Sequence, residues 1–300
     1  MVKDIKKGVN MWSFPGDMSI FQRMVRAREL GFEGIELCMS LSGDEFSLDT
    51  SDEDVKKLRE QAREAGIEIS SLCSGLYFQY SLTSARVDIR EGAKRVIKRL
   101  IDCAVILECS SVLAVPGIVG ADFRPEEVVP DVSQMVYYAG AEIVPYDVAY
   151  ERSLAAFREL APYAESRKVC IGVENIWGKF LLSPLEMRDF IDAVGSEYVK
   201  SYFDVGNSAL FGYPEQWLRI LGSRVVNIHL KDFRRGTAQL SGFCDLLSGD
   251  VDWYEVGRAL DDIDYSGWVN AEMTPVYKTY PEQIAESTSL AMDRILRRRK

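Results

Sequence analysis

Four side chains that could bind a metal ion or move protons stand at the ends of apolar segments in the second half of the chain. They are Glu174, Asp204, His229 and Glu272. Carboxylates and imidazoles are common ligands of divalent metals, and a carboxylate can also act as a general acid or base. Three carboxylates that lie together repel one another unless a positive charge lies among them. If folding gathers these side chains, we expect a divalent ion between them.

The alternation of apolar and polar residues predicts that the four side chains face the same way. Successive side chains of a strand point to opposite faces, and the more apolar set is expected to pack against helices. In each segment the other set contains the acid or the histidine. The segments are Val169–Glu174, Tyr198–Asp204, Val225–Leu230 and Trp268–Glu272. Their last inward-facing residues are then Glu, Asp, His and Glu, which would meet at one end of a sheet.

These segments belong to a strand–helix repeat that runs through the chain. The earlier strand candidates are Val9–Phe14, Gly34–Cys38, Ile67–Cys73 and Ser111–Val115. The amphipathic helix candidates are Ile20–Leu30, Asp52–Ala65, Arg90–Leu107, Asp147–Arg167, Leu185–Val194, Glu215–Leu221, Trp253–Asp261 and Glu282–Leu296. Eight such alternations favour a parallel sheet that closes on itself. We therefore predict an α/β fold in which residues 1–300 form a single (β/α)8 TIM barrel domain.

Two connections are longer than the rest, Pro116–Pro145 and Arg234–Asp250. Each follows a strand, so each is expected at the carboxyl end of the barrel, where catalytic residues gather in this architecture. Long loops within a compact domain are usually functional. The four candidate ligands and both long loops are thus expected at the same end.

The charge and the cysteines restrict the possible partners. The formal net charge is −10, and such a surface repels nucleic-acid backbones and anionic lipids. The N-terminal residues lack the apolar core of a secretory signal, and no apolar run reaches membrane-spanning length. Six cysteines without any C-x-x-C pair are typical of reduced thiols in a cytoplasmic protein. We expect a cytoplasmic protein that binds neither nucleic acid nor membrane.

The donor set also indicates which ion would bind. One imidazole and three carboxylates suit an oxygen-preferring ion, so Mn²⁺ is the first expectation, with Mg²⁺ or Co²⁺ as alternatives. Taken singly, a carboxylate at a strand end is more often a loop anchor, and a histidine on a strand is more often a core residue. The coincidence of all four on consecutive strands is what favours a site.

Several short motifs resemble those of a known group of proteins. They are Gly31-Phe-Glu-Gly-Ile-Glu36, Gly172-Val-Glu-Asn175, Tyr202-Phe-Asp-Val-Gly-Asn207, Ile228-His-Leu-Lys-Asp232 and Asn270-Ala-Glu272. With them the chain resembles, over nearly its whole length, the xylose isomerase-like TIM barrel superfamily, in its sugar-phosphate isomerase/epimerase branch. The ketose 3-epimerases of this branch include D-tagatose 3-epimerase and L-ribulose-5-phosphate 3-epimerase.

The resemblance implies roles for individual residues. Glu174, Asp204, His229 and Glu272 would hold the metal ion, and the two glutamates would also be the acid and base on opposite faces of a small sugar or sugar phosphate. Arg235 would contact substrate. Asn207 stands where the tagatose enzymes carry a substrate-binding histidine, and Phe180 stands where they carry a second glutamate. The resemblance also implies a homodimer or tetramer.

Further residues are expected to line the substrate pocket. Lys231 shares the strand parity of His229 and could meet a phosphate or hydroxyl, although a salt-bridged lysine at the rim is an equal alternative. Trp12 and Trp177 could form an apolar wall for a sugar face, or simply pack. Glu36 faces inward by parity and is expected to contact substrate.

Several activities stay open at this point. Two glutamates on two faces would give 3-epimerisation of a ketose through an enediolate, and the same pair could run an aldose–ketose shift. An inosose isomerase or dehydratase, or the metal subunit of a C-glycoside-cleaving enzyme, would reuse the same ligands. A sugar-binding barrel without activity is less favoured, because all four ligand types are kept. A zinc-cluster endonuclease is disfavoured, because the chain has one histidine and a charge of −10.

Overall fold

The computed structural model describes residues 5–119, 143–237, 240–273, 277 and 279–297. Within them, eight parallel strands close a barrel in the order β1-β10-β7-β6-β5-β4-β3-β2. The strands are β1 Ile5–Asn10, β2 Gly34–Met39, β3 Glu68–Ser74, β4 Ser111–Ala114, β5 Cys170–Glu174, β6 Val199–Asp204, β7 Val225–Leu230 and β10 Gly267–Ala271. The predicted (β/α)8 TIM barrel is confirmed.

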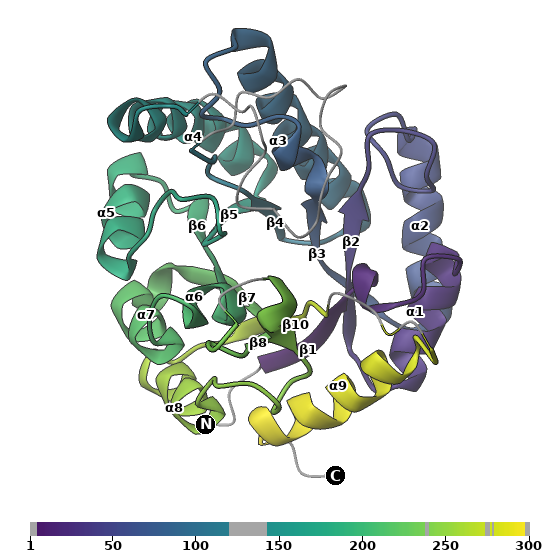
Figure 1. Cartoon of the computed structure of the whole chain (residues 1–300). Helices are drawn as coiled ribbons and strands as arrows, with labels where there is room; N and C mark the ends of the chain where they lie inside the picture. Colours follow the sequence, from purple (N-terminus) through teal and green to yellow (C-terminus); the bar gives the residue numbers. More distant parts are fainter. Residues whose placement is uncertain (1–4, 120–142, 238–239, 274–276, 278, 298–300) are drawn as a thin grey trace.

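Helices surround the ring of strands (Figure 1). They are α1 Ile20–Glu29, α2 Asp52–Ala65, α3 Val87–Leu107, α4 Tyr146–Arg167, α5 Pro184–Val194, α6 Val205–Ala209, α7 Pro214–Leu221, α8 Trp253–Asp262 and α9 Gln283–Ile295. Specific residues define several helix ends. Ser183 accepts a hydrogen bond from the backbone N–H of Glu186 at the start of α5, and Gly66 ends α2 with φ +68°, a value that glycine adopts without strain.

The first strand differs most from its prediction. The strand expected at Val9–Phe14 runs instead from Ile5 to Asn10, and Met11–Ser13 form a short 3-10 helix. The Asn10 side chain accepts a hydrogen bond from the Trp12 N–H (2.8 Å) and so turns the chain. The sequence did not predict the start of this strand because Lys7, a charged residue, lies within it. Its buried ammonium reaches Asp293 of α9 at 2.6 Å, so a charged residue occupies a strand position.

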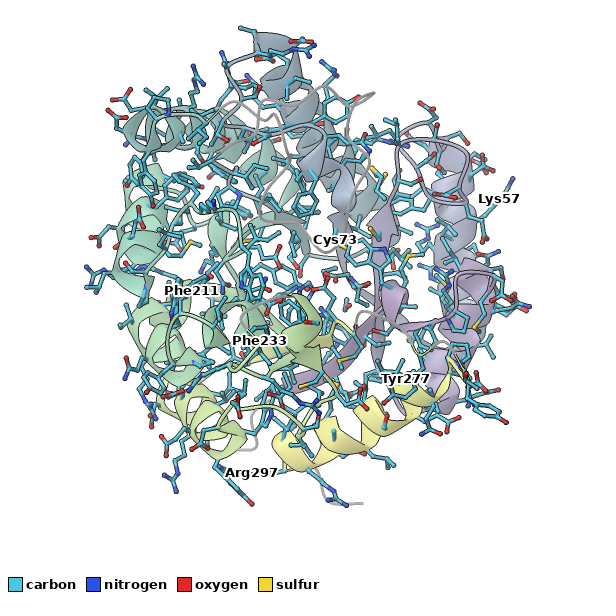
Figure 2. The ribbon with its side chains drawn as sticks, in the orientation of Figure 1. Lys57, Cys73, Phe211, Phe233, Tyr277 and Arg297 are labelled. Atoms are coloured by element: carbon cyan, nitrogen blue, oxygen red, sulfur yellow. The ribbon has the colours of Figure 1, made fainter. Side chains whose placement is uncertain are left out.

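The side chains divide between the barrel interior and the helix layer. Figure 2 shows Cys73 inside the ring of strands, whereas Lys57 of α2 and Arg297, which follows α9, lie at the outside of the molecule. The predicted inward face of β5 contains Gly172, where a Cβ atom would lie 2.8 Å from Cβ of Tyr202. The large ring of Tyr202, which is fully buried, therefore requires glycine on the neighbouring strand.

The loop after β7 contains structure that the sequence did not reveal. It begins with a two-stranded antiparallel ribbon, β8 Asp232–Phe233 and β9 Phe243–Cys244. The buried carboxylate of Asp232 accepts hydrogen bonds from the N–H groups of Gly249 (3.1 Å) and Val251 (3.3 Å) and from Nε1 of Trp253 (2.9 Å). Asp232 thus fastens the far end of this loop to its beginning.

Two further expectations concern long segments. The loop predicted at Pro116–Pro145 lies mainly outside the described residues, which stop at 119 and resume at 143. Among the described residues, no helix has both the length and the apolar character that crossing a membrane requires.

Candidate metal and catalytic site

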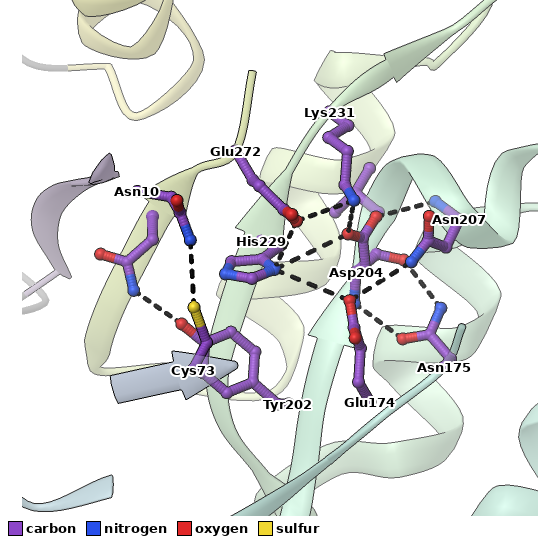
Figure 3. A network of polar contacts seen from close by, with 12 residues as sticks. Asn10, Cys73, Glu174, Asn175, Tyr202, Asp204, Asn207, His229, Lys231 and Glu272 are labelled. Atoms are coloured by element: carbon purple, nitrogen blue, oxygen red, sulfur yellow. Dashed lines mark hydrogen bonds and ion pairs between the residues drawn. The ribbon is translucent and has the colours of Figure 1, made fainter. Parts of the chain in front are cut away.

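Glu174, Asp204, His229 and Glu272 meet at the carboxyl end of the barrel, as the strand alternation predicted (Figure 3). One ligand atom from each side chain lies within 4.8 Å of the ligand atoms of the other three. All four residues are buried, with exposed fractions between 0% for Asp204 and 7% for Glu272. Such close burial of three carboxylates is costly unless positive charge compensates it.

The order of strands explains the arrangement. β10, β7, β6 and β5 are consecutive in the barrel, and the register pairs Asp204 directly with His229. His229 and Asp204 therefore lie on the two middle strands, and Glu272 and Glu174 follow or end the two outer ones. The glutamates flank the group from two sides.

The spacing of the donor atoms fits one divalent ion. Nδ1 of His229 lies 3.0 Å from Oε2 of Glu272 and 3.8 Å from both Oδ2 of Asp204 and Oε1 of Glu174. Oxygen ligands bind Mg²⁺ or Ca²⁺ at about 2.0–2.6 Å, so two ligands of one ion are at most about 5.2 Å apart. All the measured separations are within that limit.

Three of the four donor atoms also lack a conventional hydrogen bond. Within the described part of the chain, Nδ1 of His229, Oδ2 of Asp204 and Oε2 of Glu272 are buried atoms without a well-aligned hydrogen bond, although the ammonium of Lys231 lies beside the two carboxylate oxygens. Buried polar atoms are nearly always satisfied, and exceptions often indicate an ion or a functional role. Donor type, spacing and unsatisfied atoms therefore agree that these residues could hold a metal ion.

Glu36 lies beneath His229 and not at the opening of the pocket. Its carboxylate is 0% exposed, and Oε2 is 2.7 Å from Nε2 of His229. Glu36 was predicted to contact substrate, but both of its oxygens accept hydrogen bonds from other side chains. Because a carboxylate can only accept, Nε2 of His229 carries a hydrogen, and Nδ1 faces the acids. A carboxylate that orients a ligand histidine in this way is frequent in metal sites.

A polar network holds Glu36 in place. Its Oε1 accepts hydrogen bonds from Ser71 (2.7 Å) and Tyr202 (2.6 Å), and its Oε2 accepts one from Asn10 (2.5 Å). Asn270 donates to Tyr202 at 2.8 Å. The donors come from β1, β3, β6 and β10, so they span the barrel interior. The network orients Glu36, which in turn orients the imidazole of His229.

Two asparagines connect the strands that carry the candidate ligands. Asn175 donates from its amide to the backbone oxygen of Asp204 (2.8 Å) and accepts from the backbone N–H of Asp204 (2.7 Å). Asn207 donates its backbone N–H to Oδ1 of Asp204 (2.7 Å), and its amide lies 3.4 Å from Oε1 of Glu174. One oxygen of Asp204 is thereby fixed, and the other faces His229 and Lys231.

Lys231 lies directly against the candidate ligands. Its Nζ lies 2.7 Å from Oε2 of Glu272 and 2.9 Å from Oδ2 of Asp204, and its side chain is 11% exposed. The sequence left open whether this lysine meets substrate or a rim carboxylate. Its partners are two of the candidate ligands themselves.

The pKa values of the group follow from burial and from these contacts. Burial raises the pKa of Glu174 and of Asp204 above their usual values. Burial acts in the same direction on Glu272, but the positive charges of Lys231 and His229 outweigh it and hold the pKa of Glu272 well below its usual value. Burial disfavours the charged imidazole, yet Glu36 and Glu272 raise the pKa of His229 well above its ordinary value. The two glutamates therefore differ in proton affinity.

The remaining predicted contacts lie around this group. Trp177 donates from Nε1 to the backbone oxygen of Asn207 (2.8 Å) and packs edge-on against Phe233. Trp12, which is 36% exposed, follows β1 at the same end of the barrel. Arg235 is directed elsewhere, because its guanidinium donates to the backbone oxygens of Ala209 (2.8 Å) and Gly212 (3.2 Å). To contact substrate, Arg235 would have to leave these two acceptors.

The sequence did not predict the residues that orient the candidate ligands through hydrogen bonds. Tyr202, Ser71 and Asn10 received no role, although inward strand parity could have selected Tyr202. Asn175 stood within a quoted motif without an assigned function. The signal for Asn175 was its position directly after a candidate ligand, where its side chain can reach the next strand.

Comparison with known proteins adds independent information. The family described as Xylose isomerase-like TIM barrel matches residues 24–293. A protein of Escherichia coli (strain K12) named "Putative L-ribulose-5-phosphate 3-epimerase SgbU" is 25% identical over 263 residues, which cover 86% of this chain and 84% of that protein. A D-psicose 3-epimerase of Enterocloster bolteae is 31% identical over 120 residues, which cover 39% of this chain and 37% of that protein.

A solved structure shows the same architecture. The crystal structure of a D-psicose 3-epimerase in the presence of D-fructose matches with a TM-score of 0.75 and 17% sequence identity. The match covers 97% of this chain and 99% of that chain. At this identity the likeness establishes the fold.

Proposed function

The chain belongs to the xylose isomerase-like TIM barrel family, and on this premise we propose that it is a metal-dependent epimerase or isomerase of a small sugar or sugar phosphate. The activity that we favour is 3-epimerisation of a ketose or ketose phosphate. Two relatives are named as 3-epimerases of such compounds. The resemblance inferred from the motifs is confirmed, whereas the substrate of this chain is our proposal.

One observation carries the proposal: four buried donor atoms of Glu174, Asp204, His229 and Glu272 lie within 4.8 Å of one another. In our proposal they hold one divalent ion, Mn²⁺ first, with Mg²⁺ or Co²⁺ as alternatives. When bound, such an ion supplies Lewis-acid polarisation of a substrate carbonyl and compensates negative charge that develops on it.

The two glutamates provide the proton chemistry in this proposal. Glu174 and Glu272 come from the outer two of four consecutive strands, so they can reach a substrate from two sides. One carboxylate removes the proton from the carbon beside the carbonyl, and the other, in its protonated form, delivers a proton to the opposite face. Epimerisation results when the proton returns to the same carbon. Removal of a proton from C1 and delivery of a proton to C2 would give an aldose–ketose shift instead.

Neighbouring side chains would position the substrate. Asn207 and Lys231 lie against the ligands, and Trp177 and Trp12 offer apolar surfaces at the same end of the barrel. Arg235 stays a predicted contact whose side chain is engaged elsewhere. We also propose that the chain acts as one cytoplasmic domain, since all six cysteines are free thiols. The homo-oligomer implied by the resemblance stays a prediction.

Deuterium exchange tests the proposed function. Chelator-treated protein is incubated in D₂O with ketoses, ketose phosphates and inososes, with and without Mn²⁺, Mg²⁺ or Co²⁺, and products are identified by NMR. We expect deuterium at C3 of one ketose class together with the C3 epimer, only when metal is present. Deuterium at C2 of an aldose product would indicate the isomerase alternative. Absence of exchange with every substrate and metal, or equal exchange after chelation, would contradict the proposal.

A further inference from the structure

Lys231 contacts the same two oxygen atoms that a metal ion would need. Its Nζ lies 2.7 Å from Oε2 of Glu272 and 2.9 Å from Oδ2 of Asp204. These are the two carboxylate oxygens without a conventional hydrogen bond, and both face Nδ1 of His229. Figure 3 shows the ammonium group of Lys231 between the carboxylates of Glu272 and Asp204.

The backbone at Lys231 has little freedom to move away. Gly206 of α6 packs against it so closely that a Cβ atom at Gly206 would lie 2.5 Å from Cβ and 2.9 Å from the backbone oxygen of Lys231. Any change in the position of the ammonium must therefore come from rotation of the side chain. The ring of Phe243 on β9 is the adjacent surface, with its centroid 5.3 Å from Nζ.

Electrostatics makes this contact and a bound ion mutually exclusive. A monovalent ammonium and a divalent ion that share two carboxylate oxygens would lie only a few ångströms apart in a buried site, where like charges repel strongly. A divalent ion gains more from the three carboxylates than one ammonium does. Four flexible carbon–carbon bonds allow the lysine to withdraw, and the ring of Phe243, over which Nζ already lies, can keep the displaced cation.

We propose that Lys231 is a resident cation that competes with the divalent ion for Asp204 and Glu272, and that ion binding displaces its ammonium toward Phe243. The lysine then stabilises the buried carboxylates in one state and becomes available to a substrate oxygen in the other. This inference rests on the proposed metal site. It assigns to Lys231 a role that reduces metal affinity, together with a displacement of the ammonium on metal binding that a fixed salt bridge would not show.

Replacing the lysine by a neutral residue separates these roles. Lys231→Met is compared with wild type and with Lys7→Met, which removes another buried ammonium, the one paired with Asp293. Dissociation constants for Mn²⁺ and Mg²⁺ are measured by titration calorimetry on chelator-treated protein, and unfolding midpoints are measured without metal. We expect Lys231→Met to bind metal about tenfold more tightly while it unfolds at lower temperature in chelator. Lys7→Met should unfold earlier with unchanged metal affinity.

The wild-type chain provides a second measurement that does not depend on the folding of a variant. Lysines are acetylated with an amine-reactive ester with and without Mg²⁺, and modified residues are quantified by mass spectrometry. We expect Mg²⁺ to increase modification of Lys231 several-fold and to leave Lys7 unchanged.

Three results would overturn the inference, and the first two differ in meaning from the third. Unchanged or weaker metal binding by Lys231→Met, or metal-dependent protection of Lys231 from acetylation, would show that the lysine supports the ion and does not compete with it. Absence of metal binding by the wild-type chain would overturn the proposed function itself.

Discussion

The interior of the barrel contains two groups of carboxylates that differ in how their oxygens are used. Glu36 is fully buried, and both of its oxygens accept hydrogen bonds from protein groups, which are Asn10, Ser71, Tyr202 and His229. One layer nearer the opening, Asp204 and Glu272 each keep one buried oxygen without a conventional hydrogen bond. The same type of side chain therefore has two roles: Glu36 orients a neighbour, whereas Asp204 and Glu272 have oxygens that only Lys231 contacts closely and that could bind a ligand in its place.

The largest loss of activity should follow substitution of Glu174 and Glu272, the proposed acid and base. Glu174→Gln and Glu272→Gln each remove a proton-transfer group, so we expect turnover to fall about 10²–10⁴-fold. Deuterium incorporation at the substrate carbon, measured at saturating metal, should fall in parallel. Glu33→Gln is a matched control, because Glu33 accepts from the Lys7 N–H (2.8 Å) on β1, away from the ligands. Full turnover by both glutamine variants would exclude this assignment.

An intermediate effect is expected at Glu36, which lies beneath His229 and is fully buried. Glu36→Gln preserves shape but can offer Nε2 of His229 a donor in place of an acceptor, so the histidine loses its fixed orientation. We expect metal affinity to fall about 10–100-fold, measured by titration calorimetry, with kcat at saturating metal reduced much less. Glu68→Gln, at an exposed pair with Lys6 (2.8 Å), should leave metal affinity unchanged. A Glu36 variant with normal metal affinity and a raised KM would instead support the predicted contact between Glu36 and substrate.

The smallest effect on activity is expected at Arg235, whose guanidinium donates hydrogen bonds to backbone oxygens and, among the described residues, to neither Glu36 nor the candidate ligands. Arg235→Ala removes hydrogen bonds to the backbone oxygens of Ala209 and Gly212. Each such bond contributes roughly 0.5–1.5 kcal/mol, so the free energy of unfolding should fall by about 1–3 kcal/mol. Urea denaturation measures this loss, and kcat and KM should change little. A tenfold rise in KM at unchanged stability would instead make Arg235 a substrate contact, as the resemblance implied.

Local pattern determined a large part of this protein from the sequence. Alternation along a strand predicted that Glu174, Asp204 and His229 face inward, and the strand count predicted the closed barrel. These features depend on residues that are neighbours in the chain, because strand parity and helix periodicity are local. The prediction was wrong at β1, where Lys7 occupies a strand position and its partner Asp293 belongs to the last helix.

Only the tertiary structure decided which inward-facing residues contact one another. Glu36 and His229 are 193 positions apart, yet barrel closure and register bring their side chains to 2.7 Å. Strand parity placed Lys231 at the pocket, but the close packing of Gly206 against its backbone and the position of Asp204 selected its partners. Parity specifies the side of a strand on which a residue lies. The partner on that side depends on the stagger of all eight strands, which no single segment encodes.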